Sequence, residues 1–105
     1  MPATTVELLY FDGCPNQLGA RELVERIAIE AGLEVDLRLV EVTSVEEAER
    51  LRFLGSPSVR VNGRDVEPGA DSRDTFVLAC RIYQAESVFS GQPSEAWVRA
   101  ALNPS

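Results

Sequence analysis

The dipeptide Asn62-Gly63 constrains the fold of this chain more than any other sequence feature. It separates two short runs in which apolar and polar residues alternate, at residues 58–61 and 64–67. A two-residue turn of type I′ needs a positive φ angle at both central residues, which asparagine and glycine adopt most readily. The sequence therefore predicts an antiparallel hairpin at this point.

A strand, a helix and a second strand are predicted near the N-terminus. Residues 5–11 carry apolar side chains on both faces, which is typical of a buried strand, and residues 34–42 form the second strand. The alternation shifts near the end of the second strand, so both of its faces are expected to be covered there. Between the strands, apolar residues recur at three- and four-residue steps, which predicts a helix from Pro15 to about Ala31.

A second helix is predicted to follow these strands. Ser44 and Glu47 have the spacing of a capping box, in which each residue satisfies a backbone amide of the other. The helix should run for about ten residues and end at Gly55. Glu46 and Arg50 are expected to form an exposed pair along it.

The segment between the hairpin and the last helix, residues 68–92, shows no clear period. Within it, residues 71–74 have the composition of a loop, and residues 75–83 fit either a strand or a buried helix. A last helix should begin at Pro93 or Ser94. Its core-facing residues are expected to be Trp97, Val98, Ala101 and Leu102. The 105 residues suit a single α/β domain.

The composition narrows the possible chemistry. The sequence contains no histidine and no lysine, and its ten basic residues are all arginine. A Ser-His-Asp or Cys-His site needs an imidazole, and a Schiff base or a P-loop needs a lysine, so these sites are excluded. Two cysteines without histidine cannot form a structural zinc site alone. No cofactor is implied, and thiol chemistry, carboxylates and arginine remain.

The formal net charge is −7, which argues against binding to nucleic acid or to an anionic membrane surface. No apolar run approaches the length of a membrane span, and the first residues show neither a basic region nor a cleavage site. We therefore expect a cytoplasmic protein, in which both cysteines are normally reduced.

Cys14 is the strongest candidate for a reactive residue. It lies in the turn Asp12-Gly13-Cys14-Pro15, between the first strand and the first helix. A thiol there faces unpaired backbone amides and the positive end of the helix dipole, and both favour the nucleophilic thiolate. The alternative is that Cys14 is a small buried hydrophobic residue. Asp12 is expected to be a turn residue or, beside a metal-bound thiolate, a proton carrier.

Ser56-Pro57, directly before the hairpin, is the second candidate feature. Because proline lacks a backbone donor, it suits the first residue of a strand. A cis bond before Pro57 would specify a tight backbone geometry, whereas a trans bond would simply end the preceding helix. The sequence leaves both forms open.

Cys14-Pro15 at the first strand-to-helix turn and the Gly-Ser-Pro-Ser stretch at residues 55–58 resemble the thioredoxin-like family. More narrowly, residues 11–16 and 52–61 resemble small bacterial thioredoxin-like proteins, some of which carry alkylmercury-lyase-type names. The resemblance implies a thioredoxin-like α/β fold, with a four-stranded mixed sheet flanked by helices. The hairpin would supply the last two strands of that sheet.

The resemblance also implies roles for individual residues. Cys14 matches the attacking cysteine, Pro57 matches a cis-proline beside its sulfur, and Ser56 matches the residue before that proline. Backbone groups next to Pro57 would bind an extended thiol substrate, and Pro15 is expected to line the same groove. The sequence departs from the Cys-x-x-Cys motif of the family, because Gln17 stands where the second cysteine belongs.

Three routes remain open without that second cysteine. Cys14 could act as a monothiol, with glutathione or another small thiol completing the cycle. Cys80 could resolve the intermediate, or the fold could persist without catalysis. In a strand, Cys80 would share a core-facing side with Phe76, Leu78 and Ile82. If the two cysteines converged, they could instead hold a soft metal such as mercury or copper(I).

Three arginines, Arg52, Arg60 and Arg64, lie close in sequence to the expected active edge. They could recognise a carboxylate on a small thiol, because guanidinium binds carboxylates bidentately, or they could simply be solvated.

The leading prediction is a thiol-dependent oxidoreductase or thiol-transfer protein that acts through Cys14 on a small thiol or a protein disulfide. One rival is an organomercurial- or soft-metal-handling protein that uses Cys14 and Cys80. The other rival is a non-catalytic binding module with the same fold.

Overall fold

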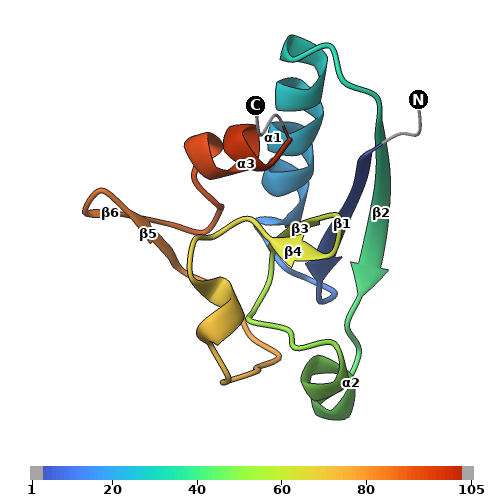
Figure 1. Cartoon of the computed structure of the whole chain (residues 1–105). Coiled ribbons are helices and arrows are strands. Elements are labelled where there is room, and N and C mark those ends of the chain that lie inside the picture. The colour runs from blue at the N-terminus through green and yellow to red at the C-terminus, as the bar shows by residue number, and fades with distance from the viewer. Residues whose placement is uncertain (1–3, 103–105) are drawn as a thin grey trace.

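A four-stranded mixed sheet organises the chain, and its strands lie in the order β2-β1-β3-β4 (Figure 1). The computed structural model describes residues 4–102. β1 pairs in parallel with β2 and antiparallel with β3, which pairs antiparallel with β4. The strands are β1 (Thr4–Tyr10), β2 (Val35–Glu41), β3 (Ser58–Val61) and β4 (Arg64–Asp65). The predicted four-stranded mixed sheet is confirmed.

Three helices and a small separate hairpin complete the described part of the chain. The helices are α1 (Gln17–Glu30), α2 (Val45–Arg50) and α3 (Glu95–Leu102), and a short 3-10 turn, η1, spans Ala70–Ser72. In Figure 1, α1 and α3 lie against one another, and the hairpin of β5 (Tyr83–Ala85) and β6 (Val88–Ser90) projects from the body. Within residues 4–102, no helix combines the length and apolar character needed to cross a membrane.

The core consists of two layers, one on each face of the central strand β1. The larger layer joins β1 and β3 to α1 and α3, and it contains Val6, Leu8, Ala20, Val24, Ile27, Val59, Val61, Val66, Val98 and Leu102. The smaller layer contains Leu9, Val42, Ala48 and Phe53. Burial of β1 on both faces is therefore confirmed, as is the core-facing side of the last helix, on which Trp97 and Ala101 pack beside Val98 and Leu102.

β2 is covered less fully than its sequence predicted. It forms an edge of the sheet, and Leu39 near its end is 42% exposed. Val42, just beyond the strand, is buried against the smaller core layer. The expectation that both faces are covered at this end is therefore correct for Val42 and wrong for Leu39.

The tight turn between β3 and β4 has the predicted geometry. Asn62 and Gly63 have φ angles of 52° and 85°, both positive as a type I′ turn requires. Val66 extends the pairing beyond β4, since its amide donates to the carbonyl of Val59 at 3.1 Å.

The first helix begins later than predicted. Asn16 is the residue that precedes its first turn, and α1 starts at Gln17, so Pro15 lies outside the helix. The second helix is shorter than predicted, because Arg52 takes a left-handed φ of 56° soon after α2 ends at Arg50. Gly55 is therefore not the residue that ends α2.

The predicted capping box at α2 forms with one change of partner. The Ser44 hydroxyl accepts a hydrogen bond from the Glu47 amide at 3.1 Å, whereas the Glu47 carboxylate accepts from the amide of Thr43 at 3.2 Å. Arg50 pairs with Glu47 at 3.7 Å rather than with Glu46.

Residues 77–83, which we call the strap, form neither the continuous strand nor the helix that were predicted for residues 75–83. Only Tyr83 belongs to a named strand. Val77 begins the strap by donating its amide to the carbonyl of Phe53 at 3.0 Å. The strap therefore packs against the segment that leads into β3.

Candidate functional site

Cys14 lies in the turn that joins β1 to α1. Gly13 before it has a φ of 87°, and the Cys14 amide donates to the carbonyl of Phe11 at 3.2 Å, which closes the turn. The residue is partly exposed, so its burial as a simple core residue is not observed. Asp12 is exposed in the same turn. No side-chain hydrogen bond from Asn16 caps α1.

The first turn of α1 is held against the loop between β6 and α3. A β-carbon placed on Gly19 would lie 2.0 Å from the side-chain nitrogen of Gln92, so the Gln92 side chain lies directly over this glycine. A β-carbon on Gly91 would similarly lie 2.2 Å from the side-chain nitrogen of Asn16. The helix start next to Cys14 therefore packs against the loop between β6 and α3 through the side chains of Gln92 and Asn16.

The peptide bond Ser56-Pro57 is cis and stands immediately before β3. The register pairs Ser58 with Leu9 near the end of β1, so the Ser56-Pro57 segment and the Cys14 turn lie at the same edge of the sheet. Ser56 is 0% exposed, and Pro57 is also fully buried. Neither side chain therefore offers a surface to a ligand in this conformation.

The strap occupies the backbone groups of Ser56. The Ser56 amide donates to the carbonyl of Ala79, and the Ser56 carbonyl accepts from the amide of Arg81, both at 2.8 Å. Ser56 and Cys80 thereby form an isolated parallel bridge. The backbone groups that the resemblance assigns to an extended substrate are thus bonded within the chain.

Arg81 anchors the strap through a buried ion network. Its guanidinium donates two hydrogen bonds to Asp65, at 2.7 and 3.1 Å, one to Glu67 at 2.7 Å, and one to the hydroxyl of Ser58 at 2.9 Å. The Arg81 side chain is 1% exposed. Burial acts to lower the pKa of Arg81, but the hydrogen bonds and charges of its carboxylate partners prevail and raise it above the ordinary value.

Tyr83 provides the second anchor. Its hydroxyl donates to the carbonyl of Pro57 at 2.6 Å, and the Arg81 guanidinium lies over its ring, 4.2 Å from the centroid. Burial raises the pKa of Tyr83 well above its ordinary value, so the phenol keeps its proton.

Gly55 allows the strap to approach. Its φ is 118°, and a β-carbon there would lie 2.9 Å from the Arg81 β-carbon and 3.2 Å from the Ala79 carbonyl oxygen. Gly55 therefore serves close packing of the strap, and this role replaces the predicted one of ending α2.

Cys80 is exposed, contrary to the predicted core position. Leu78 and Ile82, expected to share its core-facing side, are 37% and 70% exposed, whereas Arg81 and Tyr83 point inward. The strap therefore turns the opposite side to the core from the one predicted. The ion network of Arg81 and the hydrogen bond of Tyr83 stabilise this orientation, although it leaves Leu78 and Ile82 exposed. Both cysteines are free thiols, and no hydrogen bond joins Cys14 to Cys80 among residues 4–102.

Two buried polar atoms at this site lack a hydrogen-bond partner within residues 4–102. They are the Ser56 Oγ and the Arg81 Nε. The Ser56 hydroxyl is therefore a cost to folding rather than a bonded part of the site.

Sequence reasoning missed Arg81, Tyr83 and Gly55. The available signal was the alternation of Cys80, Arg81, Ile82 and Tyr83, which is compatible with either side facing inward. Because the carboxylates that pair with Arg81 come from another segment, local sequence could not decide the orientation.

The predicted arginine cluster is divided by the structure. Arg52 and Arg60 line a pocket on the side of the sheet opposite α1 and α3, whereas Arg64 pairs at 3.2 Å with Asp71, which belongs to the lining of that pocket. None of them makes a hydrogen bond or ion pair with Cys14 or Cys80 among the described residues.

Residues 4–102 bring no group of three or more histidine, cysteine or acidic side chains together in a way that could hold a metal ion. No family model, curated protein or solved structure matches this chain.

Proposed function

We propose that this chain is a thioredoxin-like thiol protein in which Cys14 acts as the single nucleophile of thiol–disulfide exchange. The proposal rests on one observation above all. The partly exposed Cys14 lies between β1 and α1, at the same edge of the sheet as the Ser56-Pro57 segment that leads into β3. Because the chain has no histidine and no lysine, an attack by Cys14 uses no imidazole or amine of the protein as a base.

The exchange needs no metal or cofactor. The Cys14 thiolate attacks one sulfur of a disulfide, forms a mixed disulfide with it, and releases the other sulfur as a thiolate that takes up a proton. A second small thiol, as its thiolate, then attacks the mixed disulfide and releases Cys14. The attacking thiol leaves as a new disulfide with the half of the substrate that Cys14 had retained, and the Cys14 thiolate is regenerated. When that half is glutathione and the attacking thiol is also glutathione, the products are oxidised glutathione and the reduced thiol of the other half. Since Gln17 replaces the second cysteine of the motif, the external thiol performs this last step.

The strap favours a small substrate over an extended protein segment. A peptide that pairs with Ser56 would have to displace Ala79 and Arg81 and disrupt the ion network with Asp65. A small disulfide, such as a mixed disulfide of glutathione, needs only the partly exposed Cys14 sulfur. We therefore infer that low-molecular-weight disulfides are the substrates.

Glutathione-dependent reduction of a small disulfide, bis(2-hydroxyethyl) disulfide, tests the proposal. We expect wild type and Cys80→Ser to be active, and Cys14→Ser to fall to the uncatalysed rate. Insulin reduction should be much slower than reduction of the small disulfide. Full activity in Cys14→Ser would remove Cys14 from the mechanism.

Two further measurements address the rival functions. If wild type forms no mixed disulfide with oxidised glutathione at Cys14, by mass spectrometry, the binding-module alternative replaces the proposal. If instead mercury(II) binds with a stoichiometry that falls in both Cys14→Ser and Cys80→Ser while exchange activity is absent, the metal-handling alternative replaces it.

A further inference from the structure

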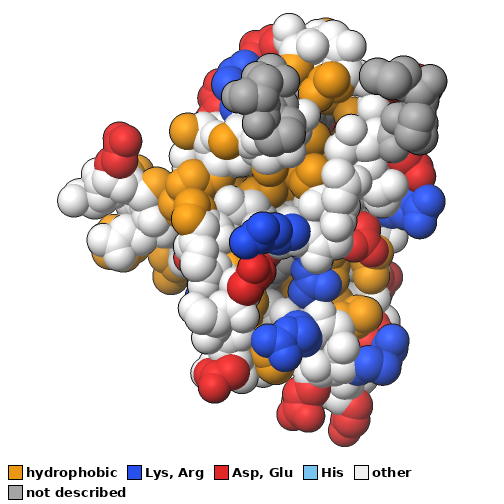
Figure 2. All heavy atoms as spheres, viewed as in Figure 1, with side chains coloured by type: hydrophobic (Ala, Val, Ile, Leu, Met, Phe, Trp, Pro, Cys, Tyr) orange, Lys and Arg blue, Asp and Glu red, His pale blue; other side chains and the backbone are white. Residues whose placement is uncertain are grey.

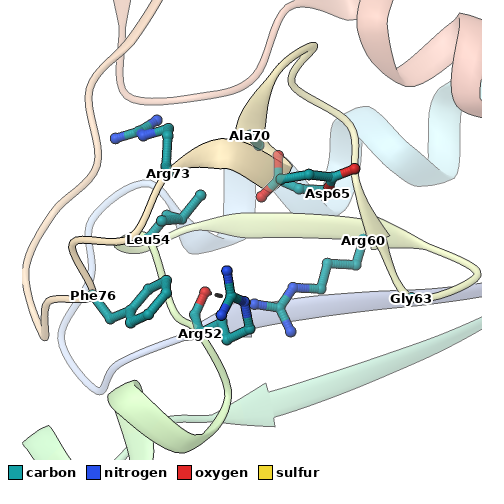
Figure 3. A pocket seen from close by; sticks show the side chains of 9 residues that line it. Arg52, Leu54, Arg60, Gly63, Asp65, Ala70, Arg73 and Phe76 are labelled. Atoms are coloured by element: carbon teal, nitrogen blue, oxygen red, sulfur yellow. Dashed lines mark hydrogen bonds between the residues drawn. The ribbon is translucent and has the colours of Figure 1, made fainter.

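A pocket of about 120 Å³ lies beside β3 and β4, on the side of the sheet away from α1 and α3. Figure 3 shows its lining, with Leu54 and Phe76 on one side and Asp65 on the other. Pockets for drug-sized molecules measure roughly 300–1,000 Å³. This pocket therefore suits a small ion or the end group of a larger molecule.

Arginine is concentrated at this pocket although the chain as a whole is acidic. Figure 2 shows arginine side chains gathered over the centre and lower part of the face that carries β3 and β4. Half of the ten arginines of the chain lie in the pocket or around it: Arg52, Arg60, Arg64, Arg73 and Arg81. In a chain with a net charge of −7, this concentration gives the pocket a local character opposite to that of the molecule.

Three of these arginines have carboxylate partners. Arg64 pairs with Asp71 at 3.2 Å, and Arg73 pairs with Glu67 at 3.3 Å. The buried Arg81 forms an ion pair with Asp65 at 2.7 Å. The two aspartates in the pocket lining are therefore already neutralised.

Arg52 and Arg60 have no such partner. Among residues 4–102, no carboxylate oxygen lies within 4.0 Å of either guanidinium, although Glu7 stands opposite Arg60 in the β1–β3 pairing. The two side chains line the same pocket (Figure 3), and, besides burial, the charge of Arg52 contributes to lowering the pKa of Arg60. One Arg60 nitrogen also donates to the backbone carbonyls of Leu51 at 2.7 Å and Arg52 at 3.0 Å. Asp65 and Glu7 act on Arg60 only from a distance, so two adjacent like charges with no carboxylate in contact favour the binding of an anion between them.

Both guanidinium groups are held in place before any ligand arrives. Arg60 is fixed by its two carbonyl partners, and Arg52 lies over the ring of Phe76, 4.8 Å from the centroid. Burial lowers the pKa of Arg60 from its ordinary value, which indicates that this cation is poorly solvated and gains from an anionic partner. Side chains that are already ordered lose little further freedom on binding.

We propose that this pocket binds a phosphate-type oxyanion between the guanidinium groups of Arg52 and Arg60. A tetrahedral oxyanion presents several oxygens to the remaining N–H donors of the two forks. The site is independent of the proposed thiol chemistry, because it includes neither cysteine.

NMR titration of the full chain with inorganic phosphate, at constant ionic strength made up with chloride, tests this site. We expect saturable shifts of the Arg52 and Arg60 side-chain N–H signals. Arg52→Gln should weaken binding by about tenfold or more, because a charge-assisted partner is lost. Arg38→Gln removes the same charge at an exposed ion pair with Asp36 and should leave binding unchanged.

Further variants separate loss of phosphate binding from loss of folding and from any effect of Cys14. Arg60→Gln removes two bonds to the backbone, so if it fails to fold, the exposed Arg52→Gln decides the matter alone. Cys14→Ser should bind phosphate normally. Tighter binding of phenyl phosphate than of inorganic phosphate would assign the pocket to the end group of a larger molecule, and weaker binding would assign it to the free ion. Shifts that do not saturate, or equal weakening by Arg38→Gln, would overturn the proposal.

Discussion

The hydroxyl of Tyr83 donates a 2.6 Å hydrogen bond to the carbonyl of Pro57, a residue 26 positions earlier in the chain. This bond joins the end of the strap to the Ser56-Pro57 segment. Both residues are fully buried, so water cannot replace either partner. The conformation at the entrance to β3 is therefore supported from outside the sheet.

Tyr83→Phe should destabilise the protein by about 1–2 kcal/mol, because it leaves the Pro57 carbonyl buried without a partner. Urea unfolding followed by circular dichroism measures this change in the free energy of unfolding. The matched control is Tyr10→Phe, since Tyr10 makes no hydroxyl hydrogen bond with residues 4–102. Equal losses in the two variants would contradict the assigned role of the bond.

Arg81→Gln should be the more damaging change, with a loss of about 3 kcal/mol or more. It leaves Asp65 and Glu67 without their buried cation, and their side chains are only 7% and 21% exposed. Arg50→Gln removes an exposed pair and should cost less than about 0.5 kcal/mol. Chemical denaturation of both variants compares them directly, and similar values would show that the buried network does not stabilise the fold.

Ser56→Ala should stabilise the protein by about 1 kcal/mol, because the buried hydroxyl that it removes has no hydrogen-bond partner. Ser58→Ala is the matched control, and it should change the free energy of unfolding in the opposite direction. The Ser58 hydroxyl donates to the Gly55 carbonyl at 2.6 Å and accepts from Arg81 at 2.9 Å, so its loss should destabilise. Thermal unfolding of the two variants separates these outcomes, and destabilisation by Ser56→Ala would contradict the first.

Glu95 should make the packing of α3 on α1 sensitive to acid. Hydrogen bonds from Arg26 and then Arg99 lower the pKa of Glu95 to about 2, against an ordinary value of 4.5. A carboxylate with a depressed pKa in the folded state contributes stability above its unfolded pKa. That contribution is lost as the pH falls from about 4.5 to about 2.

The comparison that checks this expectation is wild type against Glu95→Gln in urea unfolding at several pH values. Wild type should be the more stable protein near neutral pH, and the difference should vanish toward pH 2. High salt should reduce it, since the Arg26–Glu95 pair is exposed. A difference that stays constant with pH would contradict the assignment.

Gln17→Cys should create a dithiol with Cys14 at the start of α1. The substitution creates a Cys-x-x-Cys spacing at the start of α1, a spacing in which two thiols form a reactive disulfide pair. Mild oxidation should then close a disulfide between Cys14 and the introduced thiol, seen as the loss of free thiols and of hydrogen by mass spectrometry. Leu18→Cys, one residue further along the exposed start of α1, is the control and should not close.

Signals that lie within a few residues of one another predicted most of the fold. Asn62-Gly63 specified its turn by its own φ preferences, and Ser44 capped α2 through a neighbouring amide. The position of Cys14 between β1 and α1 also followed from the local pattern. Each of these features depends on backbone chemistry that the adjacent residues carry.

Features decided by distant partners could not be predicted in this way. The inward side of the strap depends on Asp65 and Glu67, which belong to another segment, and apolar alternation therefore pointed to the wrong side. Whether Ser56-Pro57 is cis or trans is likewise fixed by surrounding structure rather than by the dipeptide. The pocket at Arg52 and Arg60 exists only once residues 70–76 cover β3.

The strap has a consequence for how long the native state persists. Its anchors bind to surfaces that β3 and β4 must first create, so we expect it to dock after that hairpin has formed. Interactions that form after the transition state have little effect on the folding rate and act mainly by slowing unfolding. Arg81 and Tyr83 should therefore set the lifetime of the folded protein. They should also set its resistance to proteases, which cleave the chain only when it has transiently opened.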